Sequence, residues 1–368
     1  MFTQRLARVR AAMEASGTEA LLLSVGADLP WLVGYEAMPS ERLTMLVVPV
    51  DAPATLVVPG LEVARVVERP EFGVRGWGES EDPIAVVADL VGPARDLAIG
   101  DQTWSRFLVA VQHAVPDATW RPASTLTGPL RAIKEPTEVE RLQAAASGVD
   151  RIATALRSGE IPLIGRTEAE VSAELSRRIL AEGHAKVNFA IVASGANAAS
   201  PHHHASDKVI EAGEIVLCDF GGTTAEPHGE PGYCSDITRC VYTGEPPAEF
   251  SEAYDALFEA QRLGVEAATV GTAAAKIDGV ARDRLADAGL DQWFIHRLGH
   301  GIGVEAHEDP YLVEGNDAPL AAGNAFSIEP GFYVPDRWGA RIEDIVVATE
   351  EGPRALNTVD HALAIVDR

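Results

Sequence analysis

The chain is organised around one stretch, His296-Arg-Leu-Gly-His300-Gly-Ile-Gly-Val-Glu-Ala-His307-Glu-Asp-Pro310. Three of the ten histidines of the protein fall within it, and glycines at 299, 301 and 303 let the backbone come close to whatever the imidazoles hold. Neutral imidazole is the commonest metal ligand that protein side chains offer. The stretch therefore predicts a metal site.

Four carboxylates elsewhere in the chain strengthen this prediction. Asp219, Asp236, Glu329 and Glu343 each lie in an apolar run that is typical of a strand. A carboxylate in such a run is costly to bury unless it is paired or bound to a metal. Together with His300, the four would suit two divalent cations that share bridging carboxylates and a hydroxide, which is a nucleophile for an amide carbonyl at neutral pH. Carboxylate-rich ligation with one imidazole suits Mn²⁺, Co²⁺ or Zn²⁺.

Composition bounds the remaining possibilities. The 368 residues are enough for two domains with a full core each, and 46% of them are hydrophobic. The formal net charge of −25 argues against nucleic acid or an anionic membrane surface as a partner. The three cysteines show no metal-ligand spacing, and we expect reduced, buried thiols in a cytoplasmic protein. We also expect no membrane span, because no apolar run reaches about eighteen residues, and no signal peptide.

The first third of the chain alternates between helical and strand-like patterns, which is typical of an α/β domain. We expect helices over 2–16, 61–69, 83–91 and 105–115, and strands over 20–24, 43–50, 54–58 and 96–100. Residues 121–130 have the composition of a loop and mark the domain boundary.

The remainder predicts a mixed α+β domain that carries the candidate ligands on its sheet. We expect helices over 133–158, 167–182, 248–268 and 273–288, and strands over 187–193, 214–222, 236–242, 325–334 and 340–349. Thr167 and Glu170 have the spacing of a capping box at the start of the second of these helices. His300 is expected to head a glycine-rich turn.

Taken together, these motifs resemble those of the pita-bread metallopeptidases, namely prolidase (Xaa-Pro dipeptidase), Xaa-Pro aminopeptidase and, more distantly, methionine aminopeptidase. The resemblance covers the whole chain. It implies a creatinase-like α/β N-terminal domain over 1–128 and an α+β pita-bread catalytic domain over 129–368. It also implies a homodimer with two divalent metal ions, of which we favour Mn²⁺. The family's metal ligands fall here on Asp219, Asp236, His300, Glu329 and Glu343.

The same resemblance implies roles for residues beyond the metal ligands. His202 and His307 match the two substrate-facing histidines of the family, which would donate hydrogen bonds to the substrate or to the developing oxyanion. His296 matches a histidine that supports the ligands, and Arg341 matches the arginine that supports His296. Glu329 is in addition the candidate proton shuttle. His203 and His204 are expected to be loop residues.

The leading function is hydrolysis of the peptide bond before proline by a prolidase-like Xaa-Pro dipeptidase. The alternative within the family is an Xaa-Pro aminopeptidase that acts on longer peptides. A metal-free amidinohydrolase with this fold lacks the full ligand set, and a non-catalytic binding module loses ligands or substrate-facing histidines. This sequence keeps both groups, which argues against the last two classes. The expected partner is therefore a proline-containing di- or oligopeptide.

Two departures from the family pattern concern substrate selection. The interval between Asp219 and Asp236 is several residues longer than in relatives, and the extra segment 225–231 either forms a rim that limits substrate size or is a solvated loop. Some prolidases carry an arginine shortly after the residue equivalent to His307, and this chain has none there, which leaves Arg337 or Arg341 to hold a substrate carboxylate. Two aromatic residues are expected either to line a proline pocket or to belong to the core: Phe189 and Tyr333.

Overall fold

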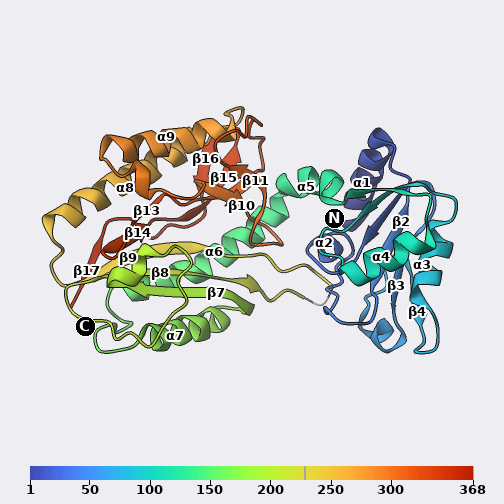
Figure 1. The fold of residues 1–368 in the computed structure, drawn as a ribbon, viewed down its shortest axis with the longest axis horizontal. Helices are drawn as coiled ribbons and strands as arrows, with labels where there is room; N and C mark the ends of the chain where they lie inside the picture. Colours follow the sequence, from blue (N-terminus) through green and yellow to red (C-terminus); the bar gives the residue numbers. More distant parts are fainter. Residues whose placement is uncertain (228, 368) are drawn as a thin grey trace. The chain divides into compact units, whose positions relative to one another are not determined.

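The computed structural model describes residues 1–227 and 229–367, which divide into two compact units (Figure 1). One unit consists of Met1–Arg131 together with Glu226–Pro231, and the other of Ala132–Ala225 together with Gly232–Arg368. Within the described residues, none of the helices combines the length and apolar character that crossing a membrane would require.

The N-terminal unit is built on a six-stranded mixed sheet with the strand order β4-β3-β2-β1-β5-β6. Its strands are β1 (Ala20–Leu23), β2 (Met45–Pro49), β3 (Ala54–Pro59), β4 (Phe72–Trp77), β5 (Asp96–Ile99) and β6 (Thr119–Pro122). Its helices are α1 (Phe2–Ser16), α2 (Asp28–Val33), the 3₁₀ helix η1 (Gly60–Arg65), α3 (Pro83–Val91), α4 (Ser105–Ala114) and α5 (Ser124–Ala132). The predicted α/β class of this part of the chain is confirmed.

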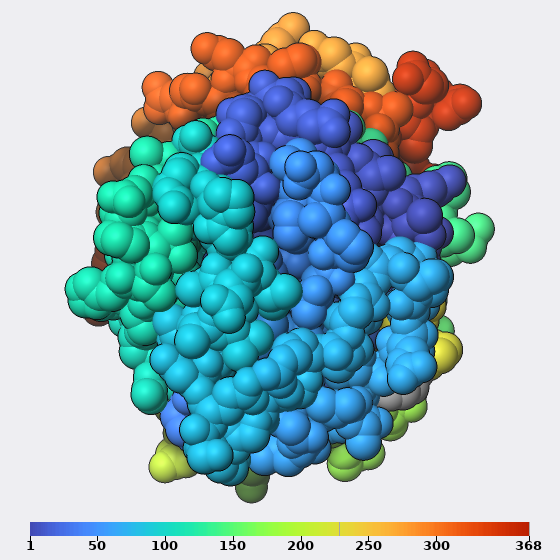
Figure 2. Space-filling view, turned by 90° about the vertical axis from the view of Figure 1, so that its right-hand side faces the viewer, coloured from blue at the N-terminus to red at the C-terminus, as the bar shows by residue number. Residues whose placement is uncertain are grey.

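Apolar spacing explains how the helices of this unit pack. Helices α3 and α4 place Val87, Val91, Phe107 and Val111 in one buried cluster with residues of β1, β2, β3 and β5. Figure 2 shows the packed side chains on one face of this unit, coloured blue to cyan. Among the described residues of this unit, few titratable side chains are buried, and they form no cluster that would suit catalysis.

Two sequence-based expectations for the N-terminal unit are wrong. Of residues 61–69, only 61–65 are helical, and they belong to the short 3₁₀ helix η1 rather than to an α-helix. Residues 121–130 are not a loop, because they contain the end of β6 and most of α5. Helix α5 forms despite its loop-like composition because Asp101 accepts hydrogen bonds from the backbone N–H and hydroxyl of Ser124, at 3.0 and 2.6 Å. These bonds satisfy donors at the start of the helix.

The second unit, Ala132–Ala225 with Gly232–Arg368, contains three sheets and four long helices among its described residues. The sheet orders are β17-β9-β8-β7, β11-β10-β12-β15-β16 and β13-β14. Its helices are α6 (Pro136–Arg157), α7 (Glu168–Ala181), α8 (Ala248–Ala267) and α9 (Ala274–Asp287), with the 3₁₀ helices η2 (Gly195–Ala199) and η3 (Asp291–Trp293). Its strands are β7 (His184–Ser194), β8 (Ile215–Thr224), β9 (Ile237–Thr243), β10 (Gly299–Gly301), β11 (Glu308–Leu312), β12 (Ala325–Ile328), β13 (Gly331–Val334), β14 (Trp338–Arg341), β15 (Asp344–Thr349), β16 (Gly352–Ala355) and β17 (Ala364–Val366).

Alternation along β8 explains why a carboxylate occupies the interior of this unit. Val216, Cys218 and Phe220 lie in a core cluster with α6 and α7. Ile215 and Leu217 face the opposite way, into the cluster formed with α8, α9 and the second sheet. Since successive side chains of a strand point to opposite faces, Asp219 shares the orientation of Leu217. The carboxylate is therefore directed away from the helical layer of α6 and α7, towards the other candidate ligands.

The structure also corrects where three of the expected ligands lie. Glu329 follows the end of β12 and Glu343 precedes the start of β15, so both occupy breaks between strands rather than strand interiors. Pro330 explains the first break, because proline has no N–H for the ladder. At the second break, between β14 and β15, Glu343 forms an isolated β-bridge with Thr238 of β9. His300 does not head a turn, since it is the central residue of the short strand β10.

The segment 225–231 follows the end of β8 and precedes Gly232. His228 lies outside the described residues. Glu226–Pro231 groups instead with the N-terminal unit, where Arg69 donates a hydrogen bond of 2.6 Å to the carbonyl oxygen of Gly229. The idea that the segment forms a rim that limits substrate size stays a prediction.

Candidate metal centre

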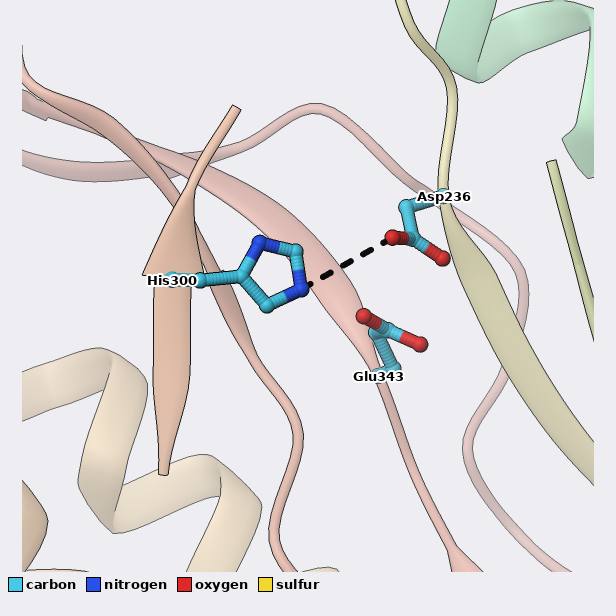
Figure 3. Close-up of side chains that lie close together, drawn as sticks. All are labelled: Asp236, His300 and Glu343. Carbon is cyan, nitrogen blue, oxygen red and sulfur yellow. Dashed lines mark ion pairs between the residues drawn. The ribbon is translucent and has the colours of Figure 1, made fainter. Parts of the chain in front are cut away.

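Three candidate ligands converge from three separate segments of the second unit. Asp236 lies just before β9, His300 is in β10 and Glu343 lies between β14 and β15. One ligand atom from each lies within 4.8 Å of the other two, and all three side chains are buried. Figure 3 shows the imidazole and the two carboxylates pointing towards one another, with 3.9 Å between His300 Nε2 and Asp236 Oδ2. This spacing would suit a shared cation.

The other two candidate ligands border the same cavity, which has a volume of about 1160 Å³. Glu329 Oε1 lies 3.2 Å from His300 Nε2. Asp219 accepts a hydrogen bond of 2.6 Å from Arg341 through Oδ2. The sequence-predicted set of Asp219, Asp236, His300, Glu329 and Glu343 is thus brought to one wall of one cavity.

The electrostatics of this cluster fit divalent cations. Burial and the neighbouring carboxylates Glu343 and Asp219 raise the pKa of Asp236 well above its usual value, and burial with Glu329 and Asp219 does the same for Glu343. The Oδ1 atoms of Asp219 and Asp236 are buried, and none of the described residues donates a hydrogen bond to them. Buried carboxylates normally have partners, so these oxygens are placed to receive a cation. Four carboxylates and one imidazole are the donor set that Mn²⁺, Co²⁺ or Zn²⁺ accepts.

The backbone around His300 sets which nitrogen of its ring can bind a metal. His300 Nδ1 lies 3.1 Å from the carbonyl oxygen of Gly301. A carbonyl can only accept a hydrogen bond, so Nδ1 carries the hydrogen and Nε2 keeps its lone pair. Nε2 is also the atom nearest to Glu329 and Asp236. The ring is therefore oriented for coordination through Nε2.

The glycines beside His300 serve a purpose that the sequence did not reveal. A Cβ at Gly299 would lie 1.9 Å from the carbonyl oxygen of Ser327 in β12, and one at Gly301 would lie 2.1 Å from that of Asp309 in β11. The expectation that they let the backbone approach a ligand is therefore wrong for these two positions. They let three strands approach one another closely enough to hold His300 between them.

His296 belongs to a buried polar chain beside the candidate ligands. Its Nε2 lies 2.9 Å from the hydroxyl of Tyr333, which accepts a hydrogen bond of 2.6 Å from Arg341. Burial lowers the pKa of His296, and its Nδ1 lies 2.7 Å from the carbonyl oxygen of Arg297, which can only accept a hydrogen bond. Nδ1 therefore carries the hydrogen of the neutral ring, and Nε2 accepts from Tyr333. Arg341 also binds Asp219 and the Thr238 hydroxyl. Arg341 thus reaches His296 through Tyr333, whose ring belongs to the buried core, one of its two expected places, and is not among the residues that line the cavity.

Replacing Tyr333 by Phe is expected to lower kcat/KM about 10- to 100-fold, the usual effect of removing a group that orients metal ligands. The change leaves the His296 and Arg341 groups that faced the hydroxyl without a partner in the interior. Steady-state kinetics together with metal content per protomer would measure the effect. Tyr242→Phe is the control, because the hydroxyl of this buried tyrosine donates to the carbonyl oxygen of Gly213 and takes no part in the polar chain. Wild-type kinetics in Tyr333→Phe would show that the bridge has no part in the site.

The irregular segment Ser200–Ala205 forms another part of the cavity wall. Residues Ser200–Ala205, which include His202, His203 and His204, all line it. His202 and His307 are exposed to the cavity, and the His307 ring lies 3.9 Å from that of His300 between centroids. Phe189 also lines the cavity and is half-buried. His203 and His204 are loop residues as expected, and this loop borders the cavity.

Arg297 is a cavity residue that the sequence analysis missed. It lines the cavity next to His296, and its guanidinium lies 4.3 Å from the ring centroid of Tyr311. Among the described residues, no carboxylate forms an ion pair with it. Arg337, in contrast, does not line the cavity and pairs with Glu249 at 2.7 Å, while Arg341 is occupied by Asp219. The one signal in the sequence was that Arg297 is the only basic residue within the histidine stretch other than the histidines themselves.

Comparison with known proteins assigns the class. Residues 140–350 match the model of metallopeptidase family M24, and residues 5–133 match that of the creatinase/prolidase N-terminal domain. The chain belongs to family M24 and is a metallopeptidase with the pita-bread fold and a creatinase-type N-terminal domain, as its resemblance implied.

Individual relatives match along nearly their whole length. The chain is 41% identical to a probable dipeptidase PepE of Mycobacterium tuberculosis, over 100% of this chain and 97% of the relative. It is 34% identical to an Xaa-Pro dipeptidase of Lactobacillus helveticus, over 96% of each. The crystal structure of dipeptidase PepE from Mycobacterium ulcerans matches with a TM-score of 0.90 and 43% identity, over 99% of this chain and 98% of that one. A prolidase from Thermococcus sibiricus matches with a TM-score of 0.92 and 31% identity, over 100% and 99%.

Proposed function

We propose that this protein is an Xaa-Pro dipeptidase that hydrolyses the bond before proline with the help of two divalent metal ions. The observation that carries the proposal is the convergence of Asp236, His300 and Glu343 within 4.8 Å, beside Asp219 and Glu329 in one cavity. Relatives described as dipeptidases and Xaa-Pro dipeptidases support the substrate class. Mn²⁺ is the metal we favour, with Co²⁺ or Zn²⁺ as alternatives.

The proposed roles follow from where each group lies. Asp219, Asp236, His300, Glu329 and Glu343 would hold the cations, which when bound supply Lewis acidity and lower the pKa of water. Glu329 is in addition the proposed proton carrier to the leaving nitrogen. His202 and His307 face the cavity from different segments and would donate hydrogen bonds to the substrate carbonyl as negative charge develops there.

A preference for dipeptides is supported by Arg297. A cation that lines the cavity without a carboxylate partner is suited to bind the terminal carboxylate of a short substrate, and guanidinium–carboxylate pairs are strong and directional. The aromatic ring of Tyr311 beneath the guanidinium would hold it in place. Arg337 and Arg341 do not suit this role because each is already paired. The cavity volume would also admit longer peptides, which keeps Xaa-Pro aminopeptidase activity as the second candidate.

The function is tested with metal-stripped and Mn²⁺-loaded protein on Gly-Pro, Gly-Pro-Gly and Gly-Leu. We expect hydrolysis of Gly-Pro by the loaded protein only, slower release of glycine from Gly-Pro-Gly, and little cleavage of Gly-Leu. Faster turnover of the tripeptide would favour the aminopeptidase. Failure to cleave either proline peptide with Mn²⁺, Co²⁺ or Zn²⁺ would contradict the proposal.

Other parts of the account stay predictions. The division into domains over 1–128 and 129–368 and the assembly of two copies into a homodimer are proposed from the family resemblance. A cytoplasmic location is supported by the three cysteines, which are buried free thiols among the described residues. Light scattering of the purified protein would test the dimer.

A further inference from the structure

Helix α7 begins with Glu168, whose carboxylate takes no part in capping the helix. Thr167 and Glu170 complete the predicted capping box, in which each side chain accepts from the backbone N–H of the other residue. Glu168, the first residue of the helix, is completely buried. Its carboxylate is therefore available to groups outside α7.

The groups that bind Glu168 come before, within and after the cavity-wall segment Ser200–Ala205 in the sequence. Glu168 accepts from the backbone N–H and hydroxyl of Ser194 at 2.7 and 2.9 Å, and from the Asn197 amide at 3.0 Å. It also accepts from His203 Nε2 at 2.8 Å, and from the hydroxyl and backbone N–H of Ser206 at 2.6 and 3.1 Å. One carboxylate thus binds the segment before the wall, a residue within it and the residue after it.

The chemistry of these contacts requires an ionised Glu168. Although burial alone would raise its pKa, hydrogen bonds from Ser206, His203 and Asn197 lower the pKa of Glu168 to about 2. An ionised carboxylate only accepts hydrogen bonds, so His203 carries its hydrogen on Nε2. Breaking some of the hydrogen bonds to this buried carboxylate would leave polar groups unpaired in the interior, which is costly. The carboxylate therefore restrains the segment that donates to it.

The held segment carries His202. Residues 201–208 form neither helix nor extended strand, so regular backbone hydrogen bonds do not fix the position of the histidine. Its neighbour His203 is fixed by Glu168, and Lys208 adds a contact of 2.9 Å to the hydroxyl of Ser194. The position of His202 in the cavity therefore depends on contacts that meet at Glu168.

We propose that Glu168 is a positioning residue, which holds the wall Ser200–Ala205 so that His202 meets the substrate in a productive orientation. The inference rests on the proposed function of His202. It adds a residue on α7 that neither borders the cavity nor belongs to the ligand set, and that acts on catalysis through the wall alone.

Glu168→Gln tests the proposal, because glutamine keeps the volume but presents an NH₂ group to donors that need an acceptor. We expect kcat/KM for Gly-Pro to fall on the order of 10- to 100-fold, since small displacements of a positioned group have effects of this size. The Mn²⁺ content should not change, because the candidate ligands lie on other elements. Glu174→Gln is the matched control on the same helix. Glu174 pairs with Arg166 and Arg178 rather than with the wall, and its loss should leave kcat/KM unchanged.

A double-mutant cycle separates positioning from general destabilisation. In a His202→Ala background, Glu168→Gln should lower kcat/KM less than about 3-fold, because the group through which it acts is gone. An equal fold-loss with and without His202 would overturn the proposal, as would wild-type kcat/KM in Glu168→Gln. If Glu168→Gln does not fold, Ser206→Ala removes the hydroxyl contact of 2.6 Å and enters the same cycle with the same two outcomes.

Amide hydrogen exchange tests, without substrate or metal, whether Glu168 restrains the cavity-wall segment Ser200–Ala205. Peptides that cover 194–206 should exchange faster in Glu168→Gln than in Glu174→Gln, while those that cover β8 and β9 should be unchanged. Unchanged exchange over 194–206 would overturn the proposal. If the wild-type enzyme cleaves no proline peptide, the proposed function fails by that assay, and the exchange measurement still decides whether Glu168 holds the wall.

Discussion

Asp236→Asn is expected to lower kcat/KM for Gly-Pro by on the order of 1,000-fold or more while stabilising the metal-free protein. The activity falls because an amide is a poor ligand in a site whose cations supply the Lewis acid and the nucleophile together. The stability rises because Asp236 is buried beside Glu343 and Asp219, and its Oδ1 has no hydrogen-bond partner. Like charges in a buried cluster oppose ionisation, and a neutral amide of the same shape removes that cost.

The two effects can be measured on the same samples. Thermal unfolding without metal should show a higher Tm for Asp236→Asn, by about 2–4 °C for each kcal/mol of relieved repulsion. On addition of Mn²⁺, the wild-type Tm should rise more than that of the variant, because binding to the folded state stabilises it. Asp283→Asn, at an exposed position of α9, should match the wild type in both assays. A variant that keeps wild-type activity would exclude Asp236 from the site.

Arg297→Ala is expected to lower kcat/KM for Gly-Pro roughly 100-fold but to affect Gly-Pro-amide less than about 3-fold. Removing one partner of a partly buried charged pair costs about 2–5 kcal/mol, which corresponds to factors of this size or larger. The amide has no carboxylate to lose. The variant should therefore reduce the difference in kcat/KM between Gly-Pro and Gly-Pro-amide, mainly by raising KM for Gly-Pro.

Arg337→Ala is the matched control for this prediction. Arg337 is an exposed arginine that stacks on Trp338 and pairs with Glu249 outside the cavity, so its loss should leave both substrates unaffected. Equal losses on Gly-Pro and its amide in Arg297→Ala would mean that the arginine shapes the cavity without binding the carboxylate. Selective loss in Arg337→Ala would move the subsite to that residue.

The parts of the fold and site that could be predicted share one property, which is that the sequence pattern itself carries the signal. The apolar run of β8 around Asp219 and the histidine stretch around His300 are rare combinations, because a buried charge needs a compensating partner. The family resemblance that these motifs carry also gave the fold class. The structure then places the five candidate ligands at one cavity.

What could not be predicted depends on contacts between distant segments. The strands are interrupted at Glu329 and Glu343 because β13 and β14 form a separate hairpin. The local sequence pattern does not predict this hairpin. The link from Arg341 to His296 through Tyr333 forms only when three separate segments of the chain come together in the fold. Glu168 looked like an ordinary first-turn acid of a helix, a position that favours acidic residues in any case. Its partners lie 26 to 38 residues further along the chain.

The most direct test of the metal centre is anomalous scattering from a crystal grown with Mn²⁺. We expect two peaks about 3.5–4 Å apart, in contact with Asp219, Asp236, His300, Glu329 and Glu343. Full occupancy of both sites should coincide with hydrolysis of Gly-Pro by the same preparation. A folded, Mn²⁺-loaded crystal with no anomalous peak among these five side chains, or with peaks only elsewhere, would contradict the account.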